Sequence, residues 1–327
     1  MELMLDGAMV VWFALTAGSL ALLVWDLLTN APVSSVQKLG WILVVFYTGP
    51  IGFVAFLYAC RRPFPGGHDR YTAATWKQGV NSEVHCLAGD ATGILIAALI
   101  ASWLALPSGW EIVLEYAAGF FCGLFIFQAL MMIGMFEGRY WLAVRRTFFA
   151  ETVSMNFVMI GMIPTMVILA SVWPESRDPA AAEFWFRMSL ASVVGGFTAF
   201  PINRWLVFRG LKHGCMTIPG ADAPVPSSHR SGEASSSHDH HDHGDHAHTM
   251  SHGMAGHHMA HESGASGASV GHEGHAGHAT YTGHEGHAGH RMATLSGAAT
   301  LGWILGTSIL FLVVVVLVGT VTPIPFA

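Results

Sequence analysis

Hydrophobic residues fall into long runs separated by short polar or Pro/Gly-rich breaks. The runs have roughly the 20 residues that a helix needs to cross about 30 Å of hydrocarbon. The pattern therefore predicts an all-α fold, a polytopic membrane helical bundle of about seven transmembrane helices. The expected spans are residues 7–28, 39–60, 84–106, 111–136, 148–172, 184–208 and 297–320. Composition agrees, since 52% of residues are hydrophobic and 11% charged, whereas a soluble domain carries about 25% charged residues.

The breaks divide the chain into four parts. We expect an N-terminal two-helix membrane anchor (1–74), a four-helix membrane unit (75–215), a polar segment (216–295) and a C-terminal transmembrane helix (296–327). The polar segment consists mainly of Gly, Ala, Ser, His and Asp. Such a composition buries too little apolar area to offset chain entropy, so this segment is expected to be a disordered loop.

The distribution of Lys and Arg predicts the orientation of the bundle. These residues gather after the second, fourth and sixth expected spans, where Lys212 is one of them. Positive charge marks cytoplasmic loops. We therefore expect an inner (cytoplasmic) membrane protein whose N-terminus and His-rich loop are cytoplasmic and whose C-terminus is outside.

The polar segment carries the clearest chemical signal. All but three of the 20 His residues lie between 229 and 290, and Gly-His-Glu-Gly-His-Ala-Gly-His occurs twice, at 271–278 and 283–290. Neutral imidazole binds Zn, Cu, Ni and Co, and the interspersed Met residues favour copper because thioethers are soft ligands. The expected ligands are His238, His240, His241, His243, His246, His248, His257, His258, Met259, His261, His272, His275, His278, His284, His287 and His290. The alternative is a low-complexity linker or a pH-dependent spacer.

Ionisable groups inside the expected spans are the next candidates, because a charge at mid-bilayer costs about 3 kcal/mol. His85, Cys86 and Asp90 open the third span. Cys86 and Asp90 are one helical turn apart and share a face. These side chains predict a place where a metal ion enters the bundle. The alternative is an interfacial His85 with an Asp90 that caps or pairs inside the bundle.

The fifth span adds Glu151 and a stripe of Met residues that includes Met155 and Met159. With His213 and Cys215, these residues complete the expected metal ligands within and beside the bundle. A Met stripe at helical spacing is also typical of adaptable packing. Depth in the membrane follows from the sequence, but lateral proximity of the helices does not.

Several short motifs lie between residues 75 and 215. They include His85-Cys-x-x-Gly-Asp90, Ser154-Met-Asn156, Gly161-Met-Ile-Pro164, Pro201-x-Asn203 and Gly210-Leu-Lys-His-Gly214. In these motifs the stretch resembles an uncharacterised bacterial and archaeal integral-membrane family, a domain of unknown function sometimes described as copper-related. The resemblance implies a shared four-helix unit and no established activity.

Several functions are excluded by the sequence. The last span has no Lys for a retinal Schiff base, only His85 lies in a span where a b-type haem needs two imidazoles, and no Walker motif for a nucleotide is present. The net charge of −6 argues against nucleic acid.

The leading hypothesis is a transition-metal transport or homeostasis protein, with copper first and zinc, nickel or cobalt next. Its expected partners are the lipid bilayer and metal ions. The alternatives are a copper-binding redox enzyme or assembly subunit, and a structural subunit whose loop tethers a partner. The sequence leaves open whether another protein or a second copy binds.

Overall fold

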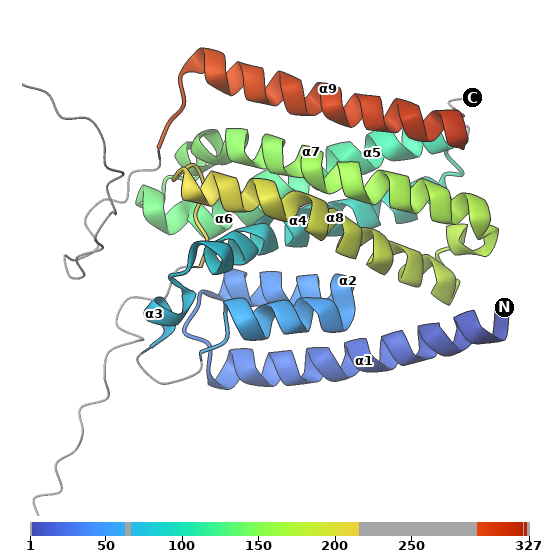
Figure 1. Cartoon of the computed structure of the whole chain (residues 1–327), viewed down its shortest axis with the longest axis horizontal. Helices are drawn as coiled ribbons and strands as arrows, with labels where there is room; N and C mark the ends of the chain where they lie inside the picture. Colours follow the sequence, from blue (N-terminus) through green and yellow to red (C-terminus); the bar gives the residue numbers. More distant parts are fainter. Residues whose placement is uncertain (1, 63–66, 216–292, 323, 326–327) are drawn as a thin grey trace, which may run out of the picture. The chain divides into compact units, whose positions relative to one another are not determined.

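A computed structural model of the chain describes residues 2–62, 67–215, 293–322 and 324–325. These residues are helical and include no strand, as the hydrophobic pattern predicts (Figure 1). The expected His and Met ligands between 238 and 290 lie outside the described residues. All described helices belong to one compact unit.

Nine α-helices are described. They are α1 (Glu2–Thr29), α2 (Ser35–Ala59), α3 (His68–Thr72), α4 (Thr75–Trp103), α5 (Ser108–Phe121), α6 (Ala129–Met132), α7 (Tyr140–Val172), α8 (Ala182–Phe208) and α9 (Gly297–Val321). A π-helical turn, Cys122–Gln128, joins α5 to α6, and short 3-10 turns follow α6 and α7 at Ile133–Phe136 and Pro174–Arg177.

Six of the helical segments are long and apolar enough to cross a membrane: α1, α2, α4, the run from α5 to Phe136, α7 and α9. The sixth expected span, 184–208, forms α8, which carries the buried Arg187 and Asn203 and is not among these six helical segments. Two helices also begin earlier than predicted, at Thr75 and Tyr140. Their first turns carry polar residues. An apolar span read from hydropathy begins after such residues, although the helical backbone continues through them.

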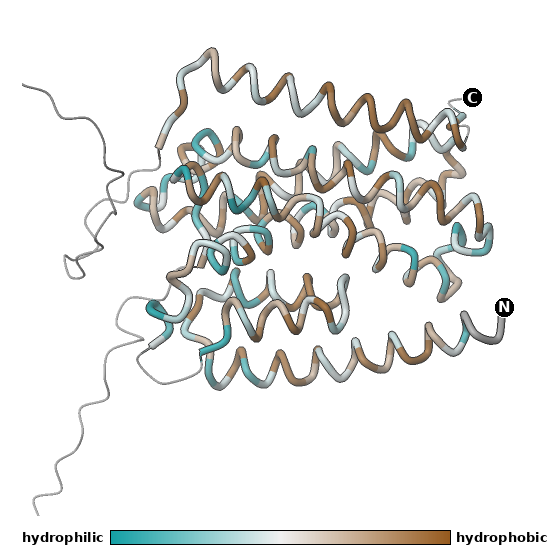
Figure 2. Tube along the Cα trace, viewed as in Figure 1, coloured by the Kyte–Doolittle hydropathy of each residue, from teal (hydrophilic) through white to brown (hydrophobic). Residues whose placement is uncertain are grey.

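Helices α4 and α7 form the centre of the bundle. Helix α4 packs against α2, α5 and α8, and α7 packs against α8 and α9. Most of the apolar stretch of α4 and of α7 is buried, whereas those of α1 and α9 are mostly exposed. Figure 2 shows hydrophobic residues along the middle of α1 and α9. Polar side chains on α4 and α7 are therefore placed inside the bundle.

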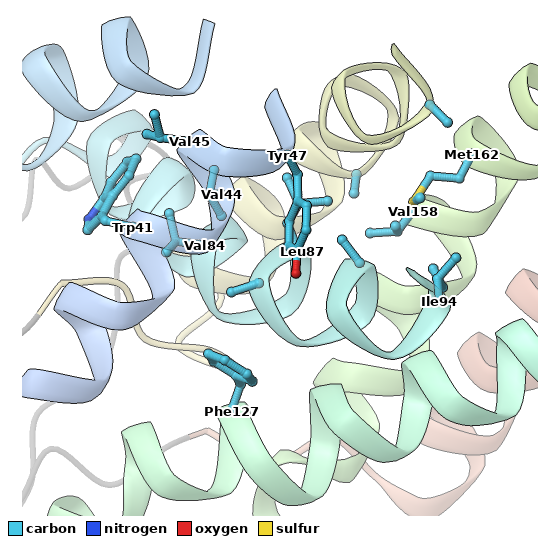
Figure 3. Close-up of a cluster of buried hydrophobic side chains, with 14 of the residues drawn as sticks. Trp41, Val44, Val45, Tyr47, Val84, Leu87, Ile94, Phe127, Val158 and Met162 are labelled. Carbon is cyan, nitrogen blue, oxygen red and sulfur yellow. The ribbon is translucent and has the colours of Figure 1, made fainter. Parts of the chain in front are cut away.

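The main core joins α2, α4 and α7 (Figure 3). Trp41 and Val44 of α2 lie near Val84 of α4, and Val158 and Met162 of α7 complete the cluster on the other side. Between membrane helices, side chains of this kind stabilise the bundle by close van der Waals packing. The core fixes α4 between its neighbours.

Glycines bring α4 and α5 into backbone contact. A Cβ at Gly89 would lie 2.6 Å from Cα of Gly123, and a Cβ at Gly93 would collide with the carbonyl of Ala118. Small residues allow such close helix approach in membranes. This contact brings the π-helical turn directly against the polar face of α4.

Candidate cation site

Cys86, Asp90 and Glu151 form a buried group of three possible metal ligands. The Cys86 sulfur and one carboxylate oxygen from each acid all lie within 4.8 Å of one another. All three side chains are completely inaccessible to solvent. Cys86 and Asp90 share a face of α4 because they are one turn apart, and Glu151 faces them from α7. The Cys86 thiol donates a 2.8 Å hydrogen bond to Oε2 of Glu151.

The remaining carboxylate oxygens lack donors. Among the described residues, no group donates a hydrogen bond to either oxygen of Asp90 or to Oε1 of Glu151. Buried carboxylate oxygens without partners are costly unless a proton or a cation neutralises them. The Asp90 and Glu151 oxygens converge on Gly123, where any Cβ would collide with both Oδ1 of Asp90 and Oε1 of Glu151. The glycine therefore preserves the room between the two carboxylates.

Gly123 lies in the π-helical turn Cys122–Gln128. A single π-helical turn within an α-helix is frequently found at functional sites. Its backbone contacts the α4 face that carries Asp90, through Gly89. The donor set, with one thiol and two carboxylates, suits a borderline divalent cation such as Zn²⁺ or Co²⁺.

A buried lysine is also part of the site. Nζ of Lys212 lies 2.7 Å from the Cys86 sulfur and 2.7 Å from Oδ1 of Asn203, and the side chain is only 1% exposed. Burial by itself lowers the pKa of Lys212, but its electrostatic interactions with Cys86 and Glu151 and its hydrogen bond to Cys86 outweigh burial, and the pKa is raised. The ammonium is therefore charged at neutral pH and contacts one of the three ligand atoms.

Asn203 extends the network to a third carboxyl group. Its Nδ2 donates to Oγ of Ser154 at 2.8 Å and to Oε2 of Glu83 at 3.2 Å. Glu83 is buried on α4, Ser154 on α7 and Asn203 on α8. One connected polar network thus runs through the three packed helices.

The turn after α8 places Lys212. Gly210 has a φ of +66°, the left-handed conformation that glycine adopts at helix C-termini. The N–H of Gly210 donates to the carbonyl of Val207, and the N–H of Leu211 to that of Leu206. These are the two bonds of a Schellman motif, and Leu206 and Leu211 pack together in its hydrophobic contact. The chain therefore turns back towards the bundle and carries Lys212 inside.

The charge balance of the network indicates which positive charges it can bind. If Glu83, Asp90 and Glu151 are all ionised, their three negative charges face the one positive charge of Lys212. A low-dielectric interior disfavours the remaining charge of −2. Two protons or one divalent cation neutralise it.

The other expected ligands lie around this group. His85, next to Cys86, points to another helix face, and its Nε2–H donates to Oε1 of Gln37 on α2 at 2.9 Å. Met155 is buried with its methyl group against Gly119. Met159 is buried in the main core, and His213 is half-buried. The structure therefore brings together Cys86, Asp90 and Glu151, and the His85 ring is not in that group of three.

Cys215 lies in a second group, with Cys60 at the end of α2 and His68 at the start of α3. One ligand atom from each of these residues lies within 4.8 Å of the others. The hydrogen bond between the two thiols, together with His68, lowers the pKa of Cys60 to about 6 against the opposing effect of burial.

A polar cavity of about 690 Å³ lies towards the other end of the bundle. Its walls include Glu111, Glu115, Met166 and Arg187. Glu115 precedes Gly123 by two helical turns, which corresponds to about 12 Å. The methyl group of Met155 contacts Gly119, between Glu115 and Gly123. Met155 therefore contacts the helix at a level between Glu115 of the cavity and Gly123 of the candidate cation site.

Three further site residues were not expected from the sequence: Glu83, Gly123 and Lys212. Asn203 and Lys212 lie in the motifs Pro201-x-Asn203 and Gly210-Leu-Lys-His-Gly214, which indicated a shared unit but not a contact. No curated protein and no solved structure matches this chain. Residues 75–212, which include every residue of the Cys86–Asp90–Glu151 group and of the Lys212 network, match the sequence model of a domain of unknown function (DUF4396).

Proposed function

We propose that this chain is an integral-membrane transport or homeostasis protein for transition-metal ions and that Cys86, Asp90 and Glu151 bind the ion within the bundle. The observation that carries the proposal is the convergence of one thiol and two carboxylates, all fully buried, within 4.8 Å of one another. Ionisable groups inside a membrane are rare, and they commonly mark the pathways of ions or protons. The carboxylate oxygens without donors supply the ligand atoms.

Lys212 supplies the internal counter-cation in this proposal. Its ammonium contacts the Cys86 sulfur. An ion that binds the sulfur therefore displaces the ammonium or pushes it towards Asn203. Two protons are released at the same time, the thiol proton of Cys86 and one carboxyl proton, and the divalent ion takes over their charge. Metal binding is thereby coupled to proton release, as in carriers that exchange ions for protons.

The route through the bundle continues towards the polar cavity. An ion that leaves the Cys86 group passes Met155 and reaches the cavity lined by Glu115 and Met166. Thioether and carboxylate groups are suitable transient ligands along this route. Met155 is the residue that has to move for the cavity and the site to communicate.

The donor set refines the choice of metal. One thiol and two carboxylates favour Zn²⁺, Co²⁺ or Ni²⁺ over Cu(I), which prefers thiolate and thioether ligands. Copper remains our proposal for the His- and Met-rich segment 216–295, which would act as an exchangeable metal buffer. We further propose seven spans including α8, in the inner membrane, with the N-terminus and this segment cytoplasmic.

Proteoliposomes test the function. Uptake of Zn²⁺, Co²⁺ and Cu(I) is measured for the wild type, for Asp90→Asn with Glu151→Gln, and for a deletion of residues 229–290. We expect the double substitution to abolish uptake of Zn²⁺ and Co²⁺, and the deletion to change the apparent affinity while transport continues. Glu137→Gln is the matched control, because Glu137 is an exposed acid outside the site.

The outcomes separate the alternatives. Equal uptake in all variants would refute the site. One tightly held copper ion that survives chelation, without flux, would instead favour a copper-binding redox enzyme or assembly subunit. Thermal unfolding of each variant in detergent establishes that lost uptake does not reflect lost folding.

A further inference from the structure

The end of α2, the start of α3 and the segment after α8 meet at Cys60, His68 and Cys215. The two sulfur atoms are 4.0 Å apart, and one ligand atom of each residue lies within 4.8 Å of the other two. Cys60 and His68 are fully buried, and Cys215 is 9% exposed. Cys215 is 155 residues from Cys60 in the sequence.

The His68 ring has the arrangement of a metal ligand. Its Nε2 lies 2.9 Å from the carbonyl oxygen of Cys60, and a carbonyl can only accept. Nε2 therefore carries the proton, and the neutral ring has its lone pair on Nδ1. Metal-binding histidines commonly donate their second ring N–H to a backbone carbonyl, which fixes the tautomer and the ring orientation.

Neighbouring contacts hold the three residues in place. The Schellman turn at Gly210 directs the chain towards Cys215. Any Cβ at Gly214 would collide with the Gln78 side chain and backbone, and Nε2 of Gln78 donates to the carbonyl of Thr72 at the end of α3 at 2.9 Å. The segment that carries Cys215 is thus packed against α3 and the start of α4.

From this geometry we propose that Cys60, His68 and Cys215 form a binding site for a thiophilic metal ion, Cu(I) or Zn²⁺. Two thiolates and an imidazole are a soft donor set. Three ligands in a buried place suit Cu(I), whereas Zn²⁺ requires a fourth ligand in the usual tetrahedral site. Binding displaces the thiol protons. The site shares no residue with the Cys86 group, so it does not depend on the proposed transport function.

The test uses a signal that the His-rich segment cannot give. The full-length protein is purified in detergent without oxygen, and Co²⁺ is added as a spectroscopic substitute for Zn²⁺, because thiolate ligands produce charge-transfer bands and imidazole alone does not. Cys60→Ser, Cys215→Ser and Cys86→Ser are compared, with Cys122→Ser as control. Cys122 is a half-buried cysteine outside both groups.

We expect Cys60→Ser and Cys215→Ser each to lose the same part of the thiolate signal, and Cys86→Ser to lose a separate part. Cu(I) affinity, measured against a chromophoric chelator that outcompetes His and Met ligands, should fall by at least about 100-fold in Cys60→Ser, since loss of a direct ligand costs more than loss of a residue that supports it. The control should match the wild type.

Each of the following results would overturn the proposal. One is a thiolate signal and Cu(I) affinity unchanged in both Cys60→Ser and Cys215→Ser, with loss of signal in Cys86→Ser alone. Another is a disulfide between Cys60 and Cys215 that persists under reducing conditions. If a variant fails to fold, alkylation of the wild type decides, at a denaturant concentration that exposes the two buried thiols of the metal-free protein to the reagent. Bound metal should then slow labelling of Cys60 and Cys215, and equal labelling with and without metal refutes the site.

Discussion

Replacing Lys212 by Met should strengthen binding of a divalent ion at the Cys86 group. The substitution removes the ammonium and keeps an unbranched side chain. A metal bound to the Cys86 sulfur lies about 2.3 Å from it, and Nζ of Lys212 lies 2.7 Å from the same atom. The ion and the ammonium would therefore be within about 5 Å of each other.

The expected size follows from Coulomb's law. A divalent ion and an ammonium about 5 Å apart repel by about 7 kcal/mol at an effective dielectric constant of about 20, and each 1.4 kcal/mol is about tenfold in affinity. Movement of the flexible lysine away from the ion relieves most of this repulsion. We therefore expect Lys212→Met to bind Co²⁺ at this site about 10- to 100-fold more tightly than the wild type.

The assay is titration with Co²⁺, followed by the part of the thiolate charge-transfer signal that Cys86→Ser removes. Lys38→Met is the matched control, because Lys38 is a half-exposed lysine of α2. The ion-free variant should unfold more easily, since removal of one partner from a buried charge network costs about 3–5 kcal/mol. A folded Lys212→Met protein with unchanged or weaker Co²⁺ affinity would refute the role of Lys212 as a competing internal cation.

Two glycines provide the remaining predictions. Gly123→Ala should weaken Co²⁺ binding at least tenfold without removing a ligand, because the new methyl group collides with both carboxylates, and should cost about 1–3 kcal/mol of stability; Gly134→Ala, where a Cβ meets nothing within 4 Å, should match the wild type in both titration and unfolding. Gly210→Ala should lower the free energy of unfolding by about 1–2 kcal/mol, the cost of a left-handed residue, and Gly210→Asn by less because Asn tolerates this conformation. Equal losses for Ala and Asn in denaturant unfolding would show that backbone conformation is not the cause.

The hydrophobic pattern predicts the long helices well because their length and apolar composition are visible locally. It places the start of α4 at 84 instead of Thr75, since the first turns of this helix are polar. Helix α3 was not predicted, because five residues that include His68 and Asp69 give no periodic signal. Helical structure there depends on contacts with the rest of the chain.

Local sequence features were also sufficient to name part of the candidate cation site. Cys86 and Asp90 share a helix face by their spacing, and Glu151 is an acid in an apolar run, so all three could be named from the sequence. Lys212 follows a helix end and was counted as a cytoplasmic surface charge, yet it is buried. Only the backbone reversal at Gly210 brings it inside, and a sequence without a known fold does not show where a reversed segment packs.

His85 shows that neighbours in the sequence can point to different partners. Its neighbour Cys86 faces Glu151, but successive residues in a helix are about 100° apart, so His85 faces Gln37 instead. Because the two residues are adjacent in the sequence, they were expected to act as a pair of ligands. In a helix, residues one turn apart are the better guide, as Cys86 and Asp90 show.

The short segment after α8 contributes a residue to each of the two proposed sites, so metal bound at one would affect the other. Lys212 and Cys215 lie three residues apart in it, and the contact of Gly214 with Gln78 leaves the segment little freedom. An ion held by Cys215 restrains this segment in the arrangement that keeps the Lys212 ammonium at the Cys86 sulfur. An ion that binds Cys86 favours displacement of that ammonium. Each ion therefore opposes the other, and linkage requires that the two effects on affinity be equal. A soft ion retained at Cys60, His68 and Cys215 would keep the bundle site in its lysine-bound state.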